Sequence, residues 1–435
     1  MNISDSEIVA SILEEKGFRS TLHIGEADMI FINTCSIRDH AEQRIRKRLE
    51  FMQSMKKKNP DLVIGMLGCM AERLKTQLLE DEKVLDLIAG PDSYRELPRL
   101  VMEVESGRKA INTLLSMDET YADISPVRYD SNGISAFISI MRGCENYCAY
   151  CVVPYVRGQE RSRDAGSVIR EAEALVQKEF REVTLLGQNV NSYHWTLDGK
   201  ITGFAELLEK VATVNPLLRI RFATSHPKDL SIELLETMAR FPNICRSIHL
   251  PVQSGSTAIL DHMNRGYTRE QYLERIASIR TLLPDCAIST DIIAGFCDET
   301  EKDHQETLSL MEKVGFDYAF MFKYSERPDT LAAEKYKDNV PSGIKDRRLR
   351  EIIDLQQKLS YQSNEKDVGK TFEVLIEGFS KRSDDFFSGR NSQNKVVVFP
   401  VTGNKPGEYV QAKISRFTSA TLIGEAEKSL PLCTD

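Results

Sequence analysis

The sequence predicts an α/β protein with an N-terminal α/β domain, a central partial barrel of six βα units and a small C-terminal antiparallel β-barrel. Strand-like and helix-like patterns alternate through the first two parts, which is typical of parallel sheets covered by helices. Near the C-terminus, short runs of alternating apolar and polar residues are separated by turn residues, which favours a small barrel. The expected boundaries are 1–117 for the N-terminal domain, 118–135 for a linker, 136–340 for the central barrel, 341–367 for a charged connector helix and 368–432 for the C-terminal barrel.

The composition is that of an ordinary globular protein. The 435 residues are 41% hydrophobic and 28% charged, and the formal net charge of -8 argues against a uniformly basic nucleic-acid-binding protein. The sequence shows no secretory signal and no apolar run of about 18 residues, so we expect no membrane association. Its nine cysteines are an odd number, which predicts reduced thiols or metal ligands in the cytoplasm rather than a disulfide framework.

Two strand-like runs of the N-terminal domain each end in a cysteine. DMIFINTC ends at Cys35 and DLVIGMLGC ends at Cys69, and a helical pattern follows each. The carboxyl ends of parallel strands meet at one edge of a sheet, and the N-terminus of a following helix stabilises a thiolate. The pattern therefore predicts a site that contains both cysteines, with two buried core thiols as the alternative.

The central part contains six strand-like runs, namely AFISIM, EVTLLG, RIRFAT, SIHLPV, AISTDIIAGF and YAFMFKYS. Polar and glycine-rich segments follow four of them: GQNVNSYH, TSHP, PVQSGS and GFCDET. In a barrel of parallel strands the chemistry lies on such loops. We expect the lone histidines here to be hydrogen-bonded structural residues: His194, His226 and His249. Three cysteines in or beside the strands are predicted core thiols: Cys245, Cys286 and Cys297.

Three cysteines lie within eight residues directly after the first of these runs. Cys144, Cys148 and Cys151 follow the pattern C-x-x-x-C-x-x-C, a loop short enough for three thiolates to converge on one iron centre. A structural zinc site takes four ligands, and no fourth ligand is obvious nearby. The triad therefore indicates an iron cluster with one iron open to another ligand, and the alternatives are a zinc knuckle or a chance grouping.

Basic and aromatic residues are interspersed in the C-terminal barrel, where the predicted strands are TFEVLIEGF, NKVVVFP, GEYVQAKISRF and TSATLIGEAE. This combination suits neutralisation of an RNA backbone and stacking on its bases. Acidic residues are about as frequent in the same segment, so a generic solvated surface explains the composition equally well. The candidate RNA contacts are Lys381, Arg382, Arg390, Lys413 and Arg416.

The stretch MRGCENYCAYCVVPYVRGQERSR, with Tyr150 before its last cysteine, resembles the radical S-adenosylmethionine (radical SAM) enzymes. Its flanking residues are similar to those of methylthiotransferases, above all the branch that modifies isopentenyladenosine in transfer RNA. The four loop segments and the run MNRGYTREQYL also resemble that family, and the C-terminal part is similar to its RNA-binding TRAM module. The resemblance, which covers nearly the whole chain, implies a 4Fe-4S cluster on the cysteine triad. It also implies S-adenosylmethionine near Tyr150, Gly187, Gln188, Asn189, Asp291 and Gly295.

The resemblance further implies an auxiliary 4Fe-4S cluster in the N-terminal domain. NTCSIRDHAEQR and GCMAER match the family's second and third ligand motifs, so Cys35 and Cys69 are the implied ligands. The first motif, a cysteine followed by Gln-Met-Asn, has no counterpart, because the chain begins at Met1, just after that cysteine would lie. We expect the auxiliary cluster of this chain to be labile or absent, and the missing first strand to weaken the N-terminal sheet.

The implied reaction replaces an unactivated adenine C–H bond by a methylthio group. No side-chain base can remove that hydrogen, so a cofactor must supply a radical, and no catalytic side chain is assigned beyond the cluster ligands. A second S-adenosylmethionine would methylate a sulfur on the auxiliary cluster. The implied partners are the tRNA anticodon stem-loop, a low-potential electron donor such as flavodoxin or ferredoxin, and a sulfur donor, and we expect a monomer.

Three alternatives stay open from the sequence alone. The first is a methylthiotransferase for threonylcarbamoyladenosine in tRNA or for a ribosomal-protein aspartate. The second is a non-catalytic iron-sulfur sensor that binds RNA. The third is a crippled enzyme that cleaves S-adenosylmethionine without inserting sulfur.

Overall fold

The computed structural model describes residues 1–34, 39–128 and 132–426, with the backbone alone for residues 39–43. The chain divides into two units. The first comprises Met1–Asp130, Ser139–Val168 and Arg327–Glu334, and the second comprises Ser131–Ile138, Ile169–Glu326 and Lys335–Asp435. Within the described ranges, none of the helices combines the length and apolar character that crossing a bilayer requires.

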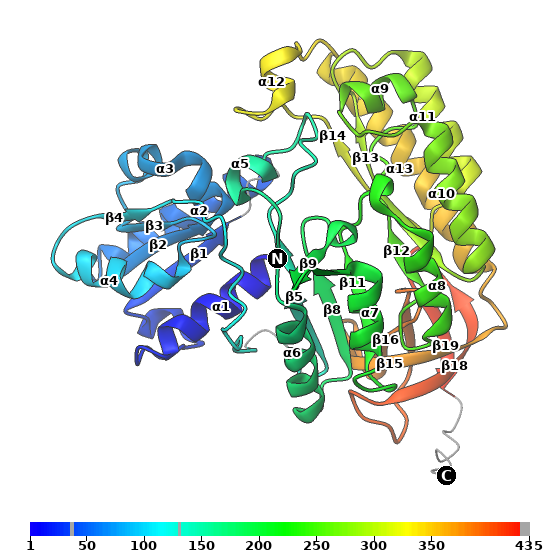
Figure 1. Cartoon of the computed structure of the whole chain (residues 1–435), viewed down its shortest axis with the longest axis horizontal. Coiled ribbons are helices and arrows are strands. Elements are labelled where there is room, and N and C mark those ends of the chain that lie inside the picture. Colours follow the sequence, from blue (N-terminus) through cyan, green and yellow to red (C-terminus); the bar gives the residue numbers. More distant parts are fainter. Residues whose placement is uncertain (35–38, 129–131, 427–435) are drawn as a thin grey trace. The chain divides into compact units, whose positions relative to one another are not determined.

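A four-stranded parallel sheet in the order β1-β2-β3-β4 forms the centre of the first unit (Figure 1). Its strands are β1 (Met29–Thr34), β2 (Val63–Gly68), β3 (Leu87–Ala89) and β4 (Ala110–Asn112). Apolar side chains of α1 (Asn2–Glu14) and α4 (Leu97–Glu105) pack on one face, and those of α2 (Asp39–Lys56) and α3 (Cys69–Asp81) pack on the other. Because both faces are covered, every residue of β2 and β3 is buried, which explains their continuous apolar sequence.

Short elements complete the first unit around the cysteine loop. They are η1 (Ile24–Glu26), η2 (Tyr94–Glu96), β6 (Met141–Arg142), α5 (Val153–Arg157), β7 (Arg161–Ser162) and α12 (Leu331–Lys335), the last residue of which belongs to the second unit. β6 and β7 pair antiparallel, so the chain leaves and re-enters one short ribbon on either side of the loop.

Two three-stranded sheets in the orders β11-β8-β5 and β12-β13-β14 form the partial barrel. The strands are β5 (Ser135–Ser139), β8 (Glu182–Leu186), β11 (Arg219–Ala223), β12 (Ser247–His249), β13 (Ala287–Ala294) and β14 (Tyr318–Lys323). A parallel bridge between Ile220 and Ile244 joins the two sheets. All six predicted strands are present, and the buried Cys245, Cys286 and Cys297 lie at or beside them as core thiols.

Helices connect the barrel strands, as expected for repeated βα units, and a long helix, α13, comes after the last of these strands. They are α6 (Ala165–Gln177), α7 (Phe204–Ala212), α8 (Ile232–Arg240), α9 (Thr257–His262), α10 (Arg269–Leu282), α11 (Glu301–Val314) and α13 (Ser342–Glu365). The loop regions add η3 (Val190–Ser192), η4 (Pro227–Asp229) and the hairpin of β9 (His194–Leu197) and β10 (Lys200–Gly203).

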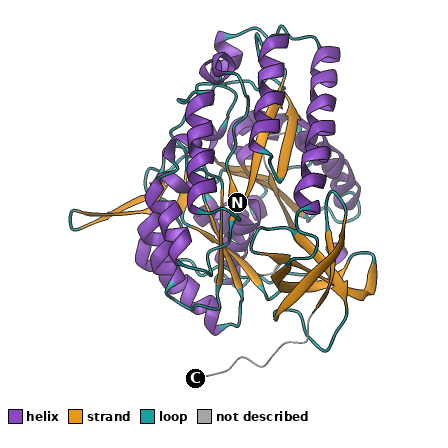
Figure 2. Ribbon diagram, turned by 90° about the vertical axis from the view of Figure 1, so that its right-hand side faces the viewer, coloured by secondary structure: helices purple, strands orange, loops and turns teal. Residues whose placement is uncertain are grey.

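A closed barrel follows α13 in the order β15-β16-β17-β19-β18, and Figure 2 shows it as a group of strands without helices. Its strands are β15 (Thr371–Ser380), β16 (Ser383–Asn391), β17 (Val396–Pro400), β18 (Tyr409–Phe417) and β19 (Leu422–Ala426). The pairing is antiparallel except between β17 and β19, which run parallel and close the barrel. The sequence analysis missed β16, because its first half, SDDFF, lacks a regular apolar alternation.

The end of β16 and the turn after it attach this barrel to the N-terminal ends of the parallel strands. Arg219 at the start of β11 donates to the Arg390 carbonyl at 2.7 Å, and Arg221 donates to the Asn391 carbonyl at 2.9 Å. The backbone N–H of Arg246, just before β12, donates to Ser392 Oγ at 2.8 Å. The small barrel therefore lies at the opposite ends of these strands from the loops that carry the predicted chemistry.

Candidate functional site

The three clustered cysteines lie in the first unit, on the loop between β6 and α5. The backbone N–H of Cys151 donates to the Cys148 carbonyl at 2.9 Å, and that of Cys144 donates to the Gly158 carbonyl at 3.2 Å. The Ala149 carbonyl accepts from the Ala332 N–H at 2.7 Å. Burial raises the pKa of the Cys144 thiol to about 11, so its thiolate needs a nearby cation such as cluster iron.

Among the described residues, only Glu301, His304 and Glu351 bring three potential ligand atoms within 4.8 Å of one another. The cysteine triad supplies three thiols from one short loop, one fewer than the four ligands of a structural zinc site. Three such ligands suit a 4Fe-4S cluster that keeps one iron open.

Cys69 lies at the N-terminus of α3, buried against Val152 and Val156 of the segment that follows the cysteine triad. Arg157 of α5 donates from Nε to Cys69 Sγ at 3.2 Å. A guanidinium and a helix N-terminus both favour a thiolate, which suits a metal ligand. The other predicted ligand of this pair, Cys35, lies outside the described residues.

A buried ion network surrounds this region. Asp5 on α1 accepts from Arg142 at 2.9 Å and from Arg157 at 2.6 Å, and all three side chains are at most 4% exposed. Asp92 lies 3.0 Å from Arg161 and 3.5 Å from Arg142. Burial would raise the pKa of Asp5, but the two arginines hold it below its ordinary value. The network joins α1 to the segments on both sides of the cysteine loop.

A second group of polar side chains gathers on the loops after β8, β11 and β12 in the second unit. Their polar atoms are buried and have no hydrogen-bond partner among the described residues. Buried polar groups are normally paired, so a concentration of unpaired ones indicates a ligand site. The atoms are Gln188 Oε1, Asn189 Oδ1, the Asn191 amide, Ser225 Oγ, His226 Nε2 and Gln253 Oε1.

Hydrogen bonds hold these loops together. Asn189 Nδ2 donates to Asp229 at 2.7 Å, and the Val190 N–H donates to the Thr224 carbonyl at 2.9 Å. Thr224 and Gln253 have φ values of 74° and 72°, a conformation that costs energy for residues other than glycine. Such strain at loops that also carry unpaired polar groups is typical of a functional site.

The predicted cofactor residues fall into three groups. Tyr150 lies in the cysteine loop of the first unit, and Gly187, Gln188 and Asn189 lie directly after β8 in the second. Asp291 on β13 lies with its Oδ1 3.4 Å from His249 Nε2, and its side chain is 27% exposed. The Gly295 N–H donates to the buried Glu299, which pairs with Arg348, so the surroundings of Gly295 are those of a structural turn.

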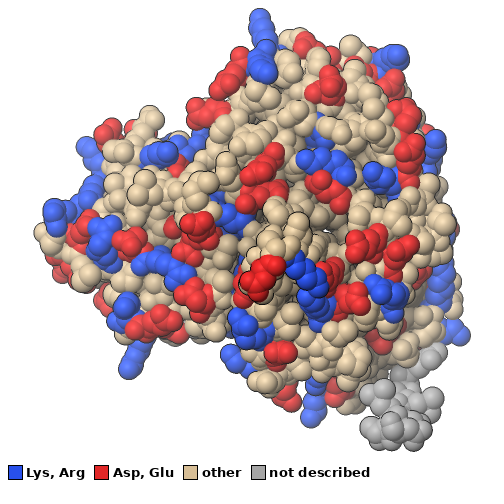
Figure 3. All heavy atoms as spheres, viewed as in Figure 1, with Lys and Arg blue, Asp and Glu red and all other residues tan. Residues whose placement is uncertain are grey.

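The structure separates the predicted RNA contacts rather than gathering them. Lys381 and Arg382 are exposed on the turn after β15, whereas Lys413 and Arg416 are exposed on β18. Lys413 pairs in register with Thr371 at the start of β15, so the two groups lie at opposite ends of that strand. Arg390 Nε lies 3.3 Å from Glu377, an ion pair. On the face shown in Figure 3, basic and acidic side chains are interspersed.

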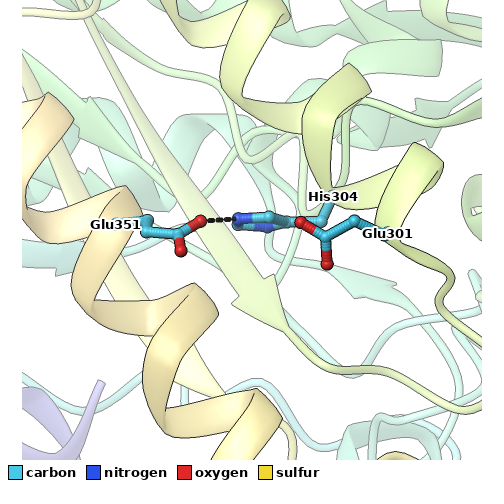
Figure 4. Close-up of side chains that lie close together, drawn as sticks. All are labelled: Glu301, His304 and Glu351. Atoms are coloured by element: carbon cyan, nitrogen blue, oxygen red, sulfur yellow. Dashed lines mark hydrogen bonds and ion pairs between the residues drawn. The ribbon is translucent and has the colours of Figure 1, made fainter.

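Glu301, His304 and Glu351 bring α11 and α13 together (Figure 4). His304 Nε2 lies 2.7 Å from Glu351, and Arg347 pairs with Glu301 at 2.5 Å and with Glu351 at 2.8 Å. The arginine already compensates both carboxylates, so the group fits an ion-paired helix contact better than a metal site.

Several residues of the two sites escaped the sequence analysis. Asp5, Arg142 and Arg157 are single charged residues far apart in the sequence, and no local pattern marks them as partners. Ser225 and Gln253 belong to the loop segments TSHP and PVQSGS, whose polar character was the available signal.

Family models match three parts of the chain. They are described as Radical SAM superfamily (residues 138–311), Uncharacterized protein family UPF0004 (residues 1–90) and TRAM domain (residues 365–426).

Curated proteins named tRNA-2-methylthio-N(6)-dimethylallyladenosine synthase are similar over nearly the whole chain. The protein from Amoebophilus asiaticus is 58% identical over 437 residues, covering 98% of this chain and 90% of its own. That from Chloroherpeton thalassium is 56% identical over 426 residues, covering 98% and 94%.

Solved structures share the fold at low identity. The radical S-adenosylmethionine methyltransferase TsrM from Kitasatospora setae has a TM-score of 0.57 and 14% identity over 76% of this chain and 72% of its own. The cobalamin-dependent S-adenosylmethionine radical enzyme OxsB has a TM-score of 0.53 and 14% identity over 81% and 53%.

Proposed function

Because the chain belongs to the radical SAM methylthiotransferases, the family of the tRNA-2-methylthio-N(6)-dimethylallyladenosine synthases, we propose that it converts N6-isopentenyladenosine beside the tRNA anticodon into its 2-methylthio derivative. The observation that carries the proposal is the 58% identity to such a synthase over 98% of the chain. The cysteine loop and the unpaired polar groups at the strand ends also support the proposal. The cysteines offer ligands for iron, and the polar groups offer hydrogen-bond partners for S-adenosylmethionine or the substrate base.

The residues of the cysteine loop fit an iron-sulfur cluster. Cys144, Cys148 and Cys151 would hold a 4Fe-4S cluster that leaves one iron open. When bound, the cluster and S-adenosylmethionine supply a radical able to remove hydrogen from an unactivated C–H bond. The protein's own contribution is to orient the ligands, because the unpaired polar groups after β8, β11 and β12 offer hydrogen bonds to S-adenosylmethionine or to the substrate base.

An auxiliary cluster would use Cys69 together with Cys35. The Arg157 N–H that reaches Cys69 Sγ would offset the negative charge of a thiolate ligand.

The small barrel would bind the stem of the tRNA through phosphates. It is attached to the N-terminal ends of the strands, so it acts at a distance from the strand-end loops rather than on the reacting base. Cationic contacts to phosphate make binding fall steeply with salt. We further propose a monomer in the cytoplasm that takes electrons from a flavodoxin or ferredoxin and sulfur from a separate donor.

Mass spectrometry of nucleosides tests the proposed function. Cluster-reconstituted protein is incubated without oxygen with S-adenosylmethionine, a reductant and tRNA that carries isopentenyladenosine but no methylthio group. We expect a 2-methylthio-isopentenyladenosine peak. If 5′-deoxyadenosine forms without that peak, the radical site stands and the substrate or the auxiliary cluster is wrong; if neither forms, the proposal fails.

A further inference from the structure

We propose that His226 donates a hydrogen bond from Nε2 to a ring nitrogen of an adenine bound at the strand ends, and so positions that base. The proposal rests on the function proposed above. Both expected ligands contain adenine: S-adenosylmethionine in its adenosyl group, and tRNA in the nucleotide to be modified. His226 is thus a positioning residue whose partner is one of these two adenines.

The local backbone decides which nitrogen of His226 carries the proton. His226 precedes η4, and the backbone N–H of Lys228 donates to its Nδ1 at 3.3 Å. A backbone N–H can only donate, so Nδ1 must present a lone pair. The proton of the neutral ring therefore lies on Nε2, on the side of the imidazole away from the Lys228 amide.

The surroundings also keep this ring neutral. Burial lowers the pKa of His226 to about 2, and the positive charges of Arg265 and Lys228 act in the same direction. The side chain is 5% exposed, and its ring meets that of Tyr267 edge to face at 5.8 Å. His226 is therefore a hydrogen-bond donor of defined orientation at physiological pH, not a proton shuttle.

This donor has no acceptor among the described residues. Nε2 of His226 is buried and unpaired, and so is the hydroxyl of the preceding Ser225. A buried N–H without an acceptor costs free energy, so we expect a ligand or an ordered water to accept its hydrogen bond. Because the neighbouring loops carry further unpaired groups, a ligand larger than water accounts for all of them together.

Adenine matches the chemistry of these groups. Its ring nitrogens accept hydrogen bonds, and its exocyclic nitrogen keeps an N–H even when it carries an isopentenyl group. His226 offers the donor, and the unpaired amides of Gln188, Asn189 and Gln253 offer oxygen acceptors. Asn189 Nδ2 donates to Asp229, three residues after His226, at 2.7 Å. Tyr267, whose ring meets that of His226, donates to the Val252 carbonyl beside Gln253 at 2.9 Å, so the three loops that carry these groups lie together.

Two substitutions separate the donor from the local fold. In His226→Asn, Oδ1 can still accept from the Lys228 N–H, but the donor at the Nε2 position is lost. In His226→Gln, the longer amide places an N–H near that position and gives up the Nδ1 acceptor. We expect H226N to bind one adenine ligand roughly tenfold more weakly, and H226Q to recover most of the loss. The matched control is His23→Asn, at an exposed histidine of the first unit.

Binding is measured separately for the two ligands. Equilibrium dialysis gives the Kd of S-adenosylmethionine on cluster-reconstituted protein, and filter binding gives the Kd of an isopentenylated anticodon stem-loop. The ligand that weakens in H226N identifies the adenine. Analogues of that ligand with 1-deaza, 3-deaza or 7-deaza adenine then identify the nitrogen: one analogue should weaken wild-type binding by the same factor and cause no further loss in H226N.

Unchanged affinities for both ligands in H226N would overturn the proposal. So would a deaza analogue that weakens binding to H226N by the same factor as binding to wild type, because the two losses would then be independent. If H226N fails to fold, His226→Phe, which keeps a ring against Tyr267 but lacks both nitrogens, replaces it in the comparison with the deaza series. A different result would contradict the proposed function: wild-type protein that binds both ligands yet forms no methylthio product.

Discussion

Two buried carboxylates of the first unit differ in their partners. Asp5 is held by Arg142 and Arg157, whose charges keep its pKa below the ordinary value despite burial. Glu72 on α3 is 1% exposed, neither of its oxygens has a hydrogen-bond partner among the described residues, and Lys75 Nζ lies 3.9 Å away. Burial, with a smaller contribution from Asp92, raises the pKa of Glu72 to about 7. Glu72 therefore weakens the fold as it ionises, whereas Asp5 does not.

Glu72→Gln should stabilise the cluster-free protein at pH 8. Because the pKa of Glu72 is 4.5 when unfolded and about 7 when folded, the native state keeps a proton that the unfolded chain loses. The free energy of unfolding therefore falls as the pH rises from 4.5 to 7, by about 1.4 kcal/mol per pH unit. We expect E72Q to exceed wild type by about 3 kcal/mol at pH 8 and by about 1 kcal/mol or less at pH 5, measured by urea unfolding.

The exposed Glu14 on α1 provides the control. Glu14→Gln removes the same charge at the surface and should change the free energy of unfolding by a few tenths of a kcal/mol at either pH. Equal effects of E72Q at pH 5 and pH 8 would show that ionisation of Glu72 is not the cause.

The cysteine loop depends on a glycine at its start. Gly143 has a φ of 79°, and a Cβ there would meet the backbone oxygen of Gln159. The next residue, Cys144, is held by its own hydrogen bond to Gly158, so a shift of Gly143 moves a cluster ligand. This close approach of the two ends of the loop is what the glycine permits.

Gly143→Ala should lower the iron content after reconstitution by at least about half, because the loop must open to admit the methyl group and its strained φ costs roughly 1 kcal/mol or more. Iron and sulfide analysis, together with the visible absorption of the cluster, measures the iron content. Gly107→Ala is the matched control, because Gly107 has a φ of 85° but open space around it. Normal iron loading in G143A, or an equal loss in G107A, would contradict the role of this contact.

At the scale of the second unit, ion pairs and hydrogen bonds attach the small barrel to the strands of the central barrel. Lys395 Nζ lies 2.7 Å from Asp367 after α13 and 3.4 Å from Asp317 before β14, which adds to the contacts made by Arg219 and Arg221. These contacts join the barrel to several elements at the N-terminal ends of the strands. Its outward ends, not its attached turn, remain available to RNA.

The end of the barrel near Lys381 and Arg382 should contact the tRNA. Phe379, 55% exposed, lies two residues before this turn and offers a stacking surface, whereas Lys413 faces Glu425 across the β18–β19 pair. We expect Lys381→Ala with Arg382→Ala to reduce the slope of log K against log salt by about 1.5, since each lost phosphate contact removes about 0.7 to 0.9. Filter binding of the anticodon stem-loop between 50 and 200 mM salt measures it.

The double variant Lys413→Ala with Arg416→Ala removes the same charge at the other end of β15. Its salt slope should change by less than about 0.5. The reverse ranking would move the RNA contact to the β18 end, and unchanged slopes in both variants would exclude both groups as phosphate contacts.

Local patterns in the sequence were sufficient to predict the architecture and to single out the cysteine loop as a candidate site. Strand and helix periodicity repeat within a few residues, and Cys144, Cys148 and Cys151 are neighbours in the chain, so neither inference required knowledge of distant contacts. The family resemblance, which a relative with 58% identity confirms, rested on the same short motifs. The strand β16 was missed where its alternation breaks down.

Folding alone brings together the groups that lie far apart in the chain. Asp5 and Arg142 are 137 residues apart, and Arg157 and Cys69 are 88 apart, yet each pair is in direct contact. The unpaired groups of Asn189, His226 and Gln253 likewise follow three different strands, namely β8, β11 and β12. A single polar residue carries no sign of its partner, because its burial, its tautomer and its charge are set by neighbours that only the folded chain supplies.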